Sequence, residues 1–376
     1  MKTVLILGSD GFIGRNLFAG LKRLSEVKIN KFDINTDKDL LEPYLKEADI
    51  IFHLAGVNRP KEIEEFVTGN VIFTQTIVDI LEKLQRNPTI VFTSSIQALL
   101  DNPYGISKRK AEDILIKYAK NSKAKIFIYR PPNVFGKWCK PNYNSVAATF
   151  CYNIANGFDI EISDANKEIE LVYIDNVVNE FMNIILDKYS SNTNNYYELK
   201  LTFKVTLGQL AEKIYQMRDI RKNLTIPDFS DTFTRYLYAT YLSYLPEDKF
   251  SYKLELKTDQ RGVLSEIIKS DYCGQIFVSK TKKGIIRGNH YHHTKVEKFC
   301  VLSGNAIIRF RHILEDKIIS YCVSGKIIEV IDIPPGYTHS IENIGNDELI
   351  VLFWADEVFN SQNPDTYFEE VESDKT

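Results

Sequence analysis

The pattern of hydrophobic runs changes once along this chain, and this change limits the folds that the chain can adopt. From Met1 to about Leu245, short β-branched runs alternate with amphipathic stretches of helical length, the pattern of a parallel sheet covered by helices. From about Lys253 onward, short alternating runs are separated by glycine and acidic turns, which is typical of an all-β barrel. We therefore expect an α/β, Rossmann-like doubly wound domain over residues 1–245 and an all-β domain over residues 246–376, joined near Pro246.

The expected elements can be placed by residue number. In the first domain the strands are Thr3–Leu7, Lys28–Asp33, Ile50–Leu54, Thr89–Ser94, Lys125–Tyr129 and Glu170–Tyr173. Helices fit between them, for example Ile13–Leu24, Val71–Leu84 and Ser107–Lys120. In the second domain the strand candidates are residues 274–282, 306–313, 318–323 and 349–355. Two domains also suit the length, because a single core rarely grows beyond roughly 250–300 residues.

The composition favours a cytoplasmic protein that acts on small molecules. A net charge of -3 provides no basic field for nucleic acid or for an anionic membrane surface. No stretch approaches the roughly 18–20 apolar residues of a membrane span, and the apolar run Val4–Leu7 leads into a glycine turn rather than a signal-peptide cleavage site. The five cysteines are odd in number and lack paired spacing, so we expect reduced, mostly buried thiols.

A glycine-rich turn follows the first expected strand. Residues 8–14 read Gly-Ser-Asp-Gly-Phe-Ile-Gly and lead into a helix, whose N-terminal N–H groups and positive dipole end suit a dinucleotide pyrophosphate. When such a glycine motif is considered without its context, the alternative is a tight strand-to-helix turn that binds no ligand. The third strand ends in small residues, which leave room for a nucleotide across the sheet edge. The candidate dinucleotide contacts in these segments are Gly8, Gly11, Phe12, Ile13, Gly14, Leu54, Ala55 and Gly56.

The fourth strand and the helix after it carry candidate catalytic groups. The strand ends at Ser94 and Ser95, and Tyr104 follows with Lys108 four residues further on, on the same helix face. We expect the Lys108 ammonium to lower the pKa of the Tyr104 phenol from about 10. The phenol can then give a proton to a carbonyl oxygen while hydride reaches the carbon and a serine hydroxyl orients the carbonyl. An exposed helix pair without catalytic meaning is the alternative.

This ordered set resembles the extended short-chain dehydrogenase/reductase family over about residues 1–245. The resemblance implies that Tyr104 is the acid, Lys108 its partner and Ser95 the residue that orients the carbonyl, with Ser94 as the alternative. Residues 130–136 resemble the family segment that touches the nicotinamide and the substrate, and residues 173–176 resemble its substrate-side segment. The implied cofactor contacts also include Ser94, Tyr104, Lys108 and Pro131.

Asp33 bears on the choice between the two nicotinamide cofactors. It ends the second strand, where an acid hydrogen-bonds the ribose 2′-hydroxyl of NADH and repels the 2′-phosphate of NADPH. Two alternatives stay open: Asp33 caps the following turn, and Arg15 or Lys31 receives a phosphate. The residues alone favour NADH.

Five of the six histidines lie in the last quarter of the chain, and three of them form a candidate metal site with a glutamate. On a strand, His290 and His292 point to the same face, and Glu297 returns from the next turn or strand. His339 offers a fourth ligand from a second segment. Three imidazoles and a carboxylate suit one divalent metal such as zinc, iron, manganese or nickel.

The two segments resemble the cupin motifs. The first, G-x5-H-x-H-x4-E-x6-G, matches in full from Gly284 to Gly304, and the second matches at Pro334, Gly336, His339 and Asn343, with Ile328 where a leading glycine is expected. A cupin with an empty site is the alternative. Residues 287–291 also resemble sugar 3,5-epimerases, in which the histidine is a base. We prefer His290 as a ligand because the other three groups complete a coordination set. His293 is expected at the surface or behind the ligands rather than as a ligand, and His312 on the surface of a strand.

The pairing of both domains resembles the CapF-type bifunctional enzymes of bacterial capsular polysaccharide biosynthesis, including residues 102–105, 135–143, 289–295 and 364–368. The resemblance implies a homodimer whose zinc-bearing cupin epimerises C3 of a UDP-linked 4-keto-6-deoxy-N-acetylhexosamine. The reductase domain would then use NADPH to give UDP-2-acetamido-2,6-dideoxy-L-talose, a precursor of UDP-N-acetyl-L-fucosamine. The alternative is a single-function 4-keto reductase with a non-catalytic cupin that serves dimerisation or regulation.

Overall fold

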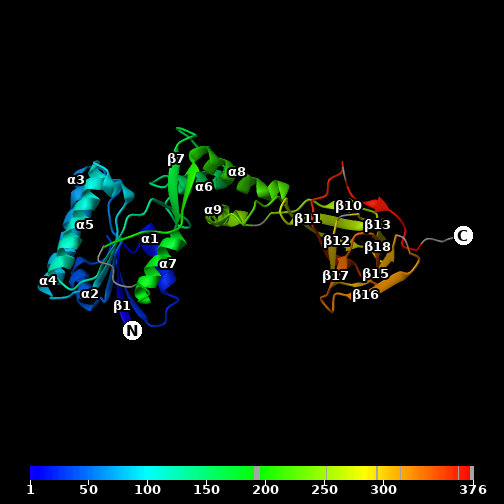
Figure 1. The fold of residues 1–376 in the computed structure, drawn as a ribbon, viewed down its shortest axis with the longest axis horizontal. Helices are drawn as coiled ribbons and strands as arrows, with labels where there is room; N and C mark the ends of the chain where they lie inside the picture. The colour runs from blue at the N-terminus through cyan, green and yellow to red at the C-terminus, as the bar shows by residue number, and fades with distance from the viewer. Residues whose placement is uncertain (190–194, 251, 294, 314, 363, 373–376) are drawn as a thin grey trace. The chain divides into compact units, whose positions relative to one another are not determined.

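A computed structural model describes the chain except residues 190–194, 251, 294, 314, 363 and 373–376 (Figure 1). Thr294, within one of the segments that resemble the CapF-type enzymes, therefore lies outside the described residues. The contacts divide the chain into two compact units. The first comprises Met1–Tyr215 and Thr232–Pro246, and the second comprises Gln216–Asp231 and Glu247–Thr376.

The first unit is built on a six-stranded parallel sheet. Its strands, in spatial order, are β2 (Val27–Phe32), β1 (Lys2–Leu7), β3 (Ile50–His53), β4 (Thr89–Thr93), β5 (Ile126–Tyr129) and β8 (Tyr196–Tyr197). Because β1 lies between β2 and β3, the strand order reverses there, and a crevice opens at the carboxyl ends of β1 and β3. The predicted Rossmann-like fold is confirmed.

Helices cover both faces of this sheet (Figure 1). One side has α1 (Phe12–Leu21) and α7 (Ile174–Ile185), which pack together, and the other has α2 (Leu41–Glu47), α4 (Phe73–Lys83) and α5 (Pro103–Asn121). Between β3 and α4 the chain forms α3 (Glu64–Phe66) and a π-helical turn at Val67–Ile72. The expected start of α5 at Ser107 was wrong, because Asn102 caps the helix by accepting a hydrogen bond from Gly105 N–H, and Pro103 occupies its first turn.

A smaller three-stranded sheet completes the first unit. Its strands are β6 (Asn133–Phe135), β7 (Glu168–Tyr173) and β9 (Thr202–Thr206), with β7 in the middle. Helices α6 (Val146–Asn156) and α9 (Thr232–Leu242) pack together, and α8 (Leu207–Asn223) begins in the first unit and ends in the second. Stacked rings of Tyr173 and Tyr236, 4.0 Å apart, connect β7 to α9.

The second unit contains two sheets whose longer strands are antiparallel and enclose an apolar core, as the sequence predicts for a cupin barrel. One sheet has the order β10 (Lys257–Asp259), β11 (Gly262–Ser270), β12 (Gly274–Thr281), β19 (Leu349–Ala355), β14 (Glu297–Ser303) and β17 (Val330–Ile333). The other has the order β16 (Ile318–Ser324), β15 (Asn305–His312), β18 (Tyr337–Asn343), β13 (Ile286–Tyr291) and β20 (Tyr367–Phe368).

Two further expectations concern membrane-spanning helices and the cysteines. Among the described residues, no helix is both long and apolar enough to cross a bilayer. All five cysteines are free thiols, but the expectation that most are buried was wrong: Cys139 and Cys151 are buried, whereas Cys273 and Cys322 are exposed. Cys273 lies in the turn between β11 and β12, and Cys322 lies in an exposed run on β16, so neither side chain faces the core.

Candidate functional site

The glycine turn after β1 brings its backbone close to the end of β3. Gly8 has φ +85°, and a Cβ there would lie 2.6 Å from Ala55 N. A Cβ on Gly14 would lie 2.1 Å from the Gly8 carbonyl oxygen. Gly11 is the N-cap of α1 and provides no side-chain hydrogen bond to the first turn. The turn therefore leaves helix N–H groups accessible to an anion, as a pyrophosphate site requires.

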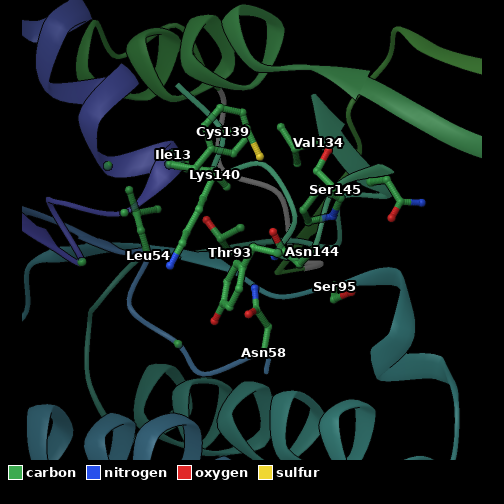
Figure 2. A pocket seen from close by; sticks show the side chains of 18 of the residues that line it. Ile13, Leu54, Asn58, Thr93, Ser95, Val134, Cys139, Lys140, Asn144 and Ser145 are labelled. Atoms are coloured by element: carbon green, nitrogen blue, oxygen red, sulfur yellow. The ribbon is translucent and has the colours of Figure 1, made fainter. Parts of the chain in front are cut away.

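Two cavities of about 600 and 1050 Å³ open beside this turn, and both are lined by Gly8, Gly11, Leu54 and Gly56. Figure 2 shows the smaller cavity, with Ile13 and Leu54 on one side and Ser95 and Asn144 on another. The candidate catalytic and cofactor-binding residues of the first domain line one cavity or both, whereas Lys31 and residues 173–176 line neither. The smaller one has Phe12, Ile13, Gly14, Ser94, Ser95, Tyr104, Lys108 and Pro131, and the larger one has Asp33 and Ala55.

The two serines after β4 have different partners. Ser95 lies near enough to the Tyr104 phenol to act on its pKa, and the Ser95 hydroxyl accepts a hydrogen bond from Gln97 N–H. Ser94 is buried and donates to Oε1 of Glu112, an acid one helical turn beyond Lys108 whose side chain has no exposed surface. Ser95 is therefore the serine that faces the Tyr104 phenol.

The Tyr104 pKa does not shift in the direction that the spacing of Tyr104 and Lys108 suggested. Burial raises the pKa of Tyr104, and the nearby Ser95 hydroxyl acts in the opposite direction. The Lys108 ammonium instead lies 4.4 Å from the ring centre of Phe92, where burial lowers its pKa to about 8 despite the charge of Glu112. The expected lowering of the Tyr104 pKa was wrong because desolvation of the phenolate dominates.

Asp33 is held by the backbone around it. Its carboxylate accepts hydrogen bonds from Asp10 N–H (2.7 Å) and Ile34 N–H (2.8 Å), so it caps the turn after β2 and braces the glycine turn. The two cations considered as phosphate ligands also have partners. Arg15 donates to the Trp138 carbonyl oxygen at 2.9 Å, and the Lys31 ammonium lies 3.3 Å from Oδ1 of Asp10.

Two further cations line the smaller cavity and were not predicted. The guanidinium of Arg59 lies 5.8 Å and the ammonium of Lys140 lies 5.1 Å from the ring centre of Tyr143. Neither forms an ion pair with a carboxylate within the described part of the chain. They come from loops after different strands, so only the fold brings them together. Their charge suits an anionic ligand.

In the second unit the four predicted metal ligands converge. One ligand atom from each of His290, His292, Glu297 and His339 lies within 4.8 Å of the others. His290 and His339 are paired residues of β13 and β18, and Glu297 begins β14. His290, His292 and Glu297 line a cavity of about 530 Å³, together with Arg287 and Phe277.

The polar atoms of this cluster fit a metal ion. His339 is fully buried, and its Nε2 lies 3.4 Å from Oε2 of Glu297 without making a hydrogen bond. Burial would raise the pKa of Glu297, but the neighbouring His292 and His339 lower it, so the group is a carboxylate. Burial lowers the pKa of His290 to about 4, which keeps that imidazole neutral. Three imidazoles and a carboxylate, with one ring nitrogen unpartnered, are the donors that a divalent metal requires.

The two spare histidines lie apart from this cluster. His293 is exposed beside Tyr367, with their ring centres 4.9 Å apart. His312 is partly buried and contacts Tyr337, with ring centres 5.0 Å apart.

Comparisons with known proteins agree with the division of the chain into two domains. Residues 4–199 match the NAD dependent epimerase/dehydratase family, and residues 257–367 match the polysaccharide biosynthesis C-terminal domain. The crystal structure of the capsular polysaccharide assembling protein CapF from Staphylococcus aureus is similar with a TM-score of 0.91 and 46% identity, over 98% of this chain and 100% of that one.

Two further relatives extend the comparison. A UDP-2-acetamido-2,6-beta-L-arabino-hexul-4-ose reductase from Pseudomonas aeruginosa is 42% identical over 97% of both chains. The UDP-glucuronic acid 4-epimerase from Bacillus cereus in complex with NAD has a TM-score of 0.53 at 18% identity, over 64% of this chain and 98% of that one, and shares the fold alone.

Fold and site together define a short-chain dehydrogenase/reductase domain of the nucleotide-sugar type followed by a cupin domain. Within that class the chain belongs to the CapF-type family of capsular polysaccharide biosynthesis enzymes.

Proposed function

We propose that the chain is a bifunctional nucleotide-sugar enzyme with one reaction in each domain, residues 1–245 and 246–376. The cupin domain epimerises C3 of a UDP-linked 4-keto-6-deoxy-N-acetylhexosamine. The reductase domain then reduces the C4 ketone with NADPH to UDP-2-acetamido-2,6-dideoxy-L-talose, on the route to UDP-N-acetyl-L-fucosamine. The observation that carries the proposal is the meeting of Tyr104 and Ser95 in a cavity that begins at the glycine turn.

In the reductase domain, Tyr104 gives its proton to the C4 oxygen and Ser95 orients that carbonyl by a hydrogen bond. A nicotinamide cofactor, when bound along the glycine turn, supplies the hydride for C4. Burial raises the pKa of Tyr104, which keeps the phenol protonated at neutral pH and suits a proton donor in reduction. Lys108, with a pKa near 8, stays largely cationic at pH 7 and supports the phenolate that forms.

The choice of NADPH follows the family resemblance and not a residue contact. The two hydrogen bonds that Asp33 accepts from Asp10 N–H and Ile34 N–H support its role as a turn cap. A carboxylate occupied in this way opposes a 2′-phosphate less strongly than a free one. Initial rates with NADPH and NADH under the same conditions test the choice, and a higher kcat/KM with NADH would contradict it.

In the cupin domain, His290, His292, Glu297 and His339 would hold the metal, for which we propose zinc. The C4 ketone makes the proton on C3 acidic, and a divalent metal at this site would supply a Lewis acid for the negative charge that develops on the ketone oxygen. Loss of the C3 proton and return of a proton to the opposite face of C3 together invert that carbon. His290 serves as a ligand in this proposal, since its neutral imidazole faces His339 with ring centres 4.6 Å apart.

Proton NMR in deuterated water tests the two-reaction proposal. The full chain is incubated with the UDP-linked 4-keto sugar without nicotinamide, before and after chelation of the metal. Loss of the C3 proton signal only with metal supports epimerisation by the cupin. Exchange absent from both samples would favour the single-function reductase with a non-catalytic cupin. Tyr104→Phe is the matched control, because it should abolish reduction and retain the exchange.

We also propose that the enzyme acts in the cytoplasm as a homodimer, as its composition and family resemblance suggest. Sedimentation velocity of the purified chain tests the oligomeric state. A species of 43.4 kDa, the mass of one chain, at micromolar concentration would contradict the dimer.

A further inference from the structure

A segment near the C-terminus pairs with β13, the strand that carries the proposed metal ligand His290 and ends just before His292. This C-terminal strap, Pro364–Val371, pairs with β13 at His290↔Phe368 and Tyr291↔Tyr367. Glu369 N–H donates to the Asn289 carbonyl oxygen at 3.0 Å. The strap therefore belongs to the wall of the histidine cluster although it lies about seventy residues further along the chain.

Asp365, at the start of the strap, makes three hydrogen bonds to the segment after β13. Its backbone carbonyl oxygen accepts from Nδ1 of His292 at 2.6 Å. Its carboxylate accepts from His293 N–H through Oδ1 and from Lys295 N–H through Oδ2, both at 3.0 Å. One residue thus fixes both the imidazole ring of His292 and the backbone on either side of residue 294.

The backbone of Asp365 is held in a conformation that serves these contacts. Its φ is +37°, in a region that few residues other than glycine adopt, although aspartate tolerates it better than most. The carboxylate and the carbonyl can face the same segment only with the chain turned in this way. The conformation is maintained by the two hydrogen bonds to the carboxylate.

The hydrogen bond at Nδ1 decides which nitrogen of His292 faces the cluster as a ligand. A carbonyl oxygen only accepts, so Nδ1 must carry the proton. The other ring nitrogen, Nε2, faces Oε2 of Glu297 at 3.3 Å, and a proton that it shares with this carboxylate must leave when a metal binds. A lone pair at this position is what a metal shared with Glu297 and His339 requires, and partners of this kind orient metal-binding histidines in general.

We propose that Asp365 is a positioning residue of the metal centre, which fixes the tautomer and orientation of His292 so that its Nε2 is ready to bind a divalent cation. This inference rests on the metal site of the proposed function. It adds that affinity for the cation depends on a residue that contacts no metal and comes from the C-terminal strap.

The rest of the strap is anchored without Asp365, so its removal should leave the fold intact. Arg311 donates to the carbonyl oxygens of Glu370 (2.9 Å) and Val371 (3.1 Å) and pairs with the Glu369 carboxylate at 2.7 Å. Lys295 donates to the Pro364 carbonyl oxygen at 2.8 Å.

Zinc affinity of the full chain tests the proposal. Zn²⁺ alone is titrated against a chromogenic chelator with the wild type, Asp365→Ala and Asp365→Gly. We expect binding weakened by about 10- to 100-fold in both variants, the range for lost partners of ligating histidines. Because glycine adopts a positive φ without strain, a loss common to both belongs to the carboxylate. Asp271→Ala, at an exposed residue of the β11–β12 turn, is the control and should bind as the wild type does.

A double-mutant cycle separates positioning from general loosening. In a His292→Ala background, Asp365→Ala should weaken zinc binding no further, because the ring that it positions is gone. An equal loss in that background, or wild-type affinity of Asp365→Ala, would overturn the inference while leaving the metal site intact. Failure of the wild type itself to bind zinc would overturn both.

Discussion

Ser94 and Ser95 are neighbours in the chain, yet their surroundings give them different tasks. The Ser94 hydroxyl donates to the buried carboxylate of Glu112, while Ser95 lies with Tyr104 in the lining of the cavity. A hydroxyl that already donates to a buried carboxylate has no proton left for a substrate carbonyl. The geometry therefore supports Ser95 as the residue that orients the carbonyl.

Replacing each serine by alanine tests this division. Ser95→Ala should lower kcat for ketone reduction by about 100-fold, the cost of one lost donor to a developing oxyanion. Ser94→Ala should change kcat only a few-fold and lower the free energy of unfolding by about 1–2 kcal/mol, because Glu112 loses a donor. Steady-state NADPH oxidation and urea unfolding provide the two measurements. A larger kcat loss in Ser94→Ala would reverse the assignment.

His53, at the end of β3, gives the first unit a pH-dependent stability. It is 1% exposed, and burial together with the Lys108 charge lowers its pKa to about 3. The unfolded chain binds this proton at about pH 6.5, so between these values the unfolded state holds more protons. The free energy of unfolding should therefore fall by about 1.4 kcal/mol for each pH unit below about 6.

Trp138 fluorescence in a Trp354→Phe background can follow this loss, because Trp138 belongs to the first unit. His53→Leu should remove this part of the pH slope between pH 4 and 6. Thr74→Val removes the hydrogen bond of 2.9 Å to His53 Nε2 and the one that Thr74 Oγ1 donates to the Asn70 carbonyl oxygen, but it leaves His53 in place and should retain the slope. A slope unchanged in His53→Leu would show that other groups cause the acid sensitivity.

At the scale of elements, α5 connects the catalytic groups to the sheet. Tyr104, Lys108 and Glu112 follow one another at four-residue spacing, and the Glu112 carboxylate accepts from both Ser94 and the guanidinium of Arg130. Arg130 begins the segment that lines the cavity at Pro131. One buried carboxylate thus ties α5 to the ends of β4 and β5.

Glu112→Gln tests how much this connection contributes to the free energy of unfolding of the first unit. The change leaves the Arg130 charge without its partner and should lower the free energy of unfolding of the first unit by about 3 kcal/mol, as broken buried pairs do. The Lys108 pKa should also fall further, because the Glu112 charge raises it. Asp113→Asn, an exposed neighbour on the same helix, should stay within about 0.5 kcal/mol of the wild type in urea unfolding. Equal losses in both variants would contradict a special role for Glu112.

Some of these elements and residues could be predicted from the sequence and others could not, for physical reasons. The glycine turn, Tyr104 with Lys108 and the cupin ligands follow local spacing rules, so they could be recognised without coordinates. The partners of Ser94 and Lys108 could not, since both depend on Glu112 and Phe92 being buried beside them. Arg59 and Lys140 come from separate loops, and no local pattern relates them. Asp365 acts on His292 across 73 residues of sequence.

At the scale of the whole molecule, the two units have separate cores and each contains one of the two tryptophans, Trp138 and Trp354. The histidine cluster belongs to the second unit alone. A ligand that binds only the folded form stabilises it by about 4 kcal/mol at a thousand times its Kd. The proposed metal should therefore stabilise the second unit without acting on the first.

Thermal unfolding followed by each tryptophan can test this independence. With Trp138→Phe, which leaves Trp354 as the reporter, saturating zinc should raise the unfolding midpoint by several degrees, and chelation should reverse the rise. With Trp354→Phe, which leaves Trp138, the midpoint should not move. His339→Ala should abolish the rise seen by Trp354, since it removes one of the converging ligands. A zinc-dependent shift of equal size at Trp138 would mean that the units unfold as one cooperative body, and separate reactions in separate domains would lose their structural basis.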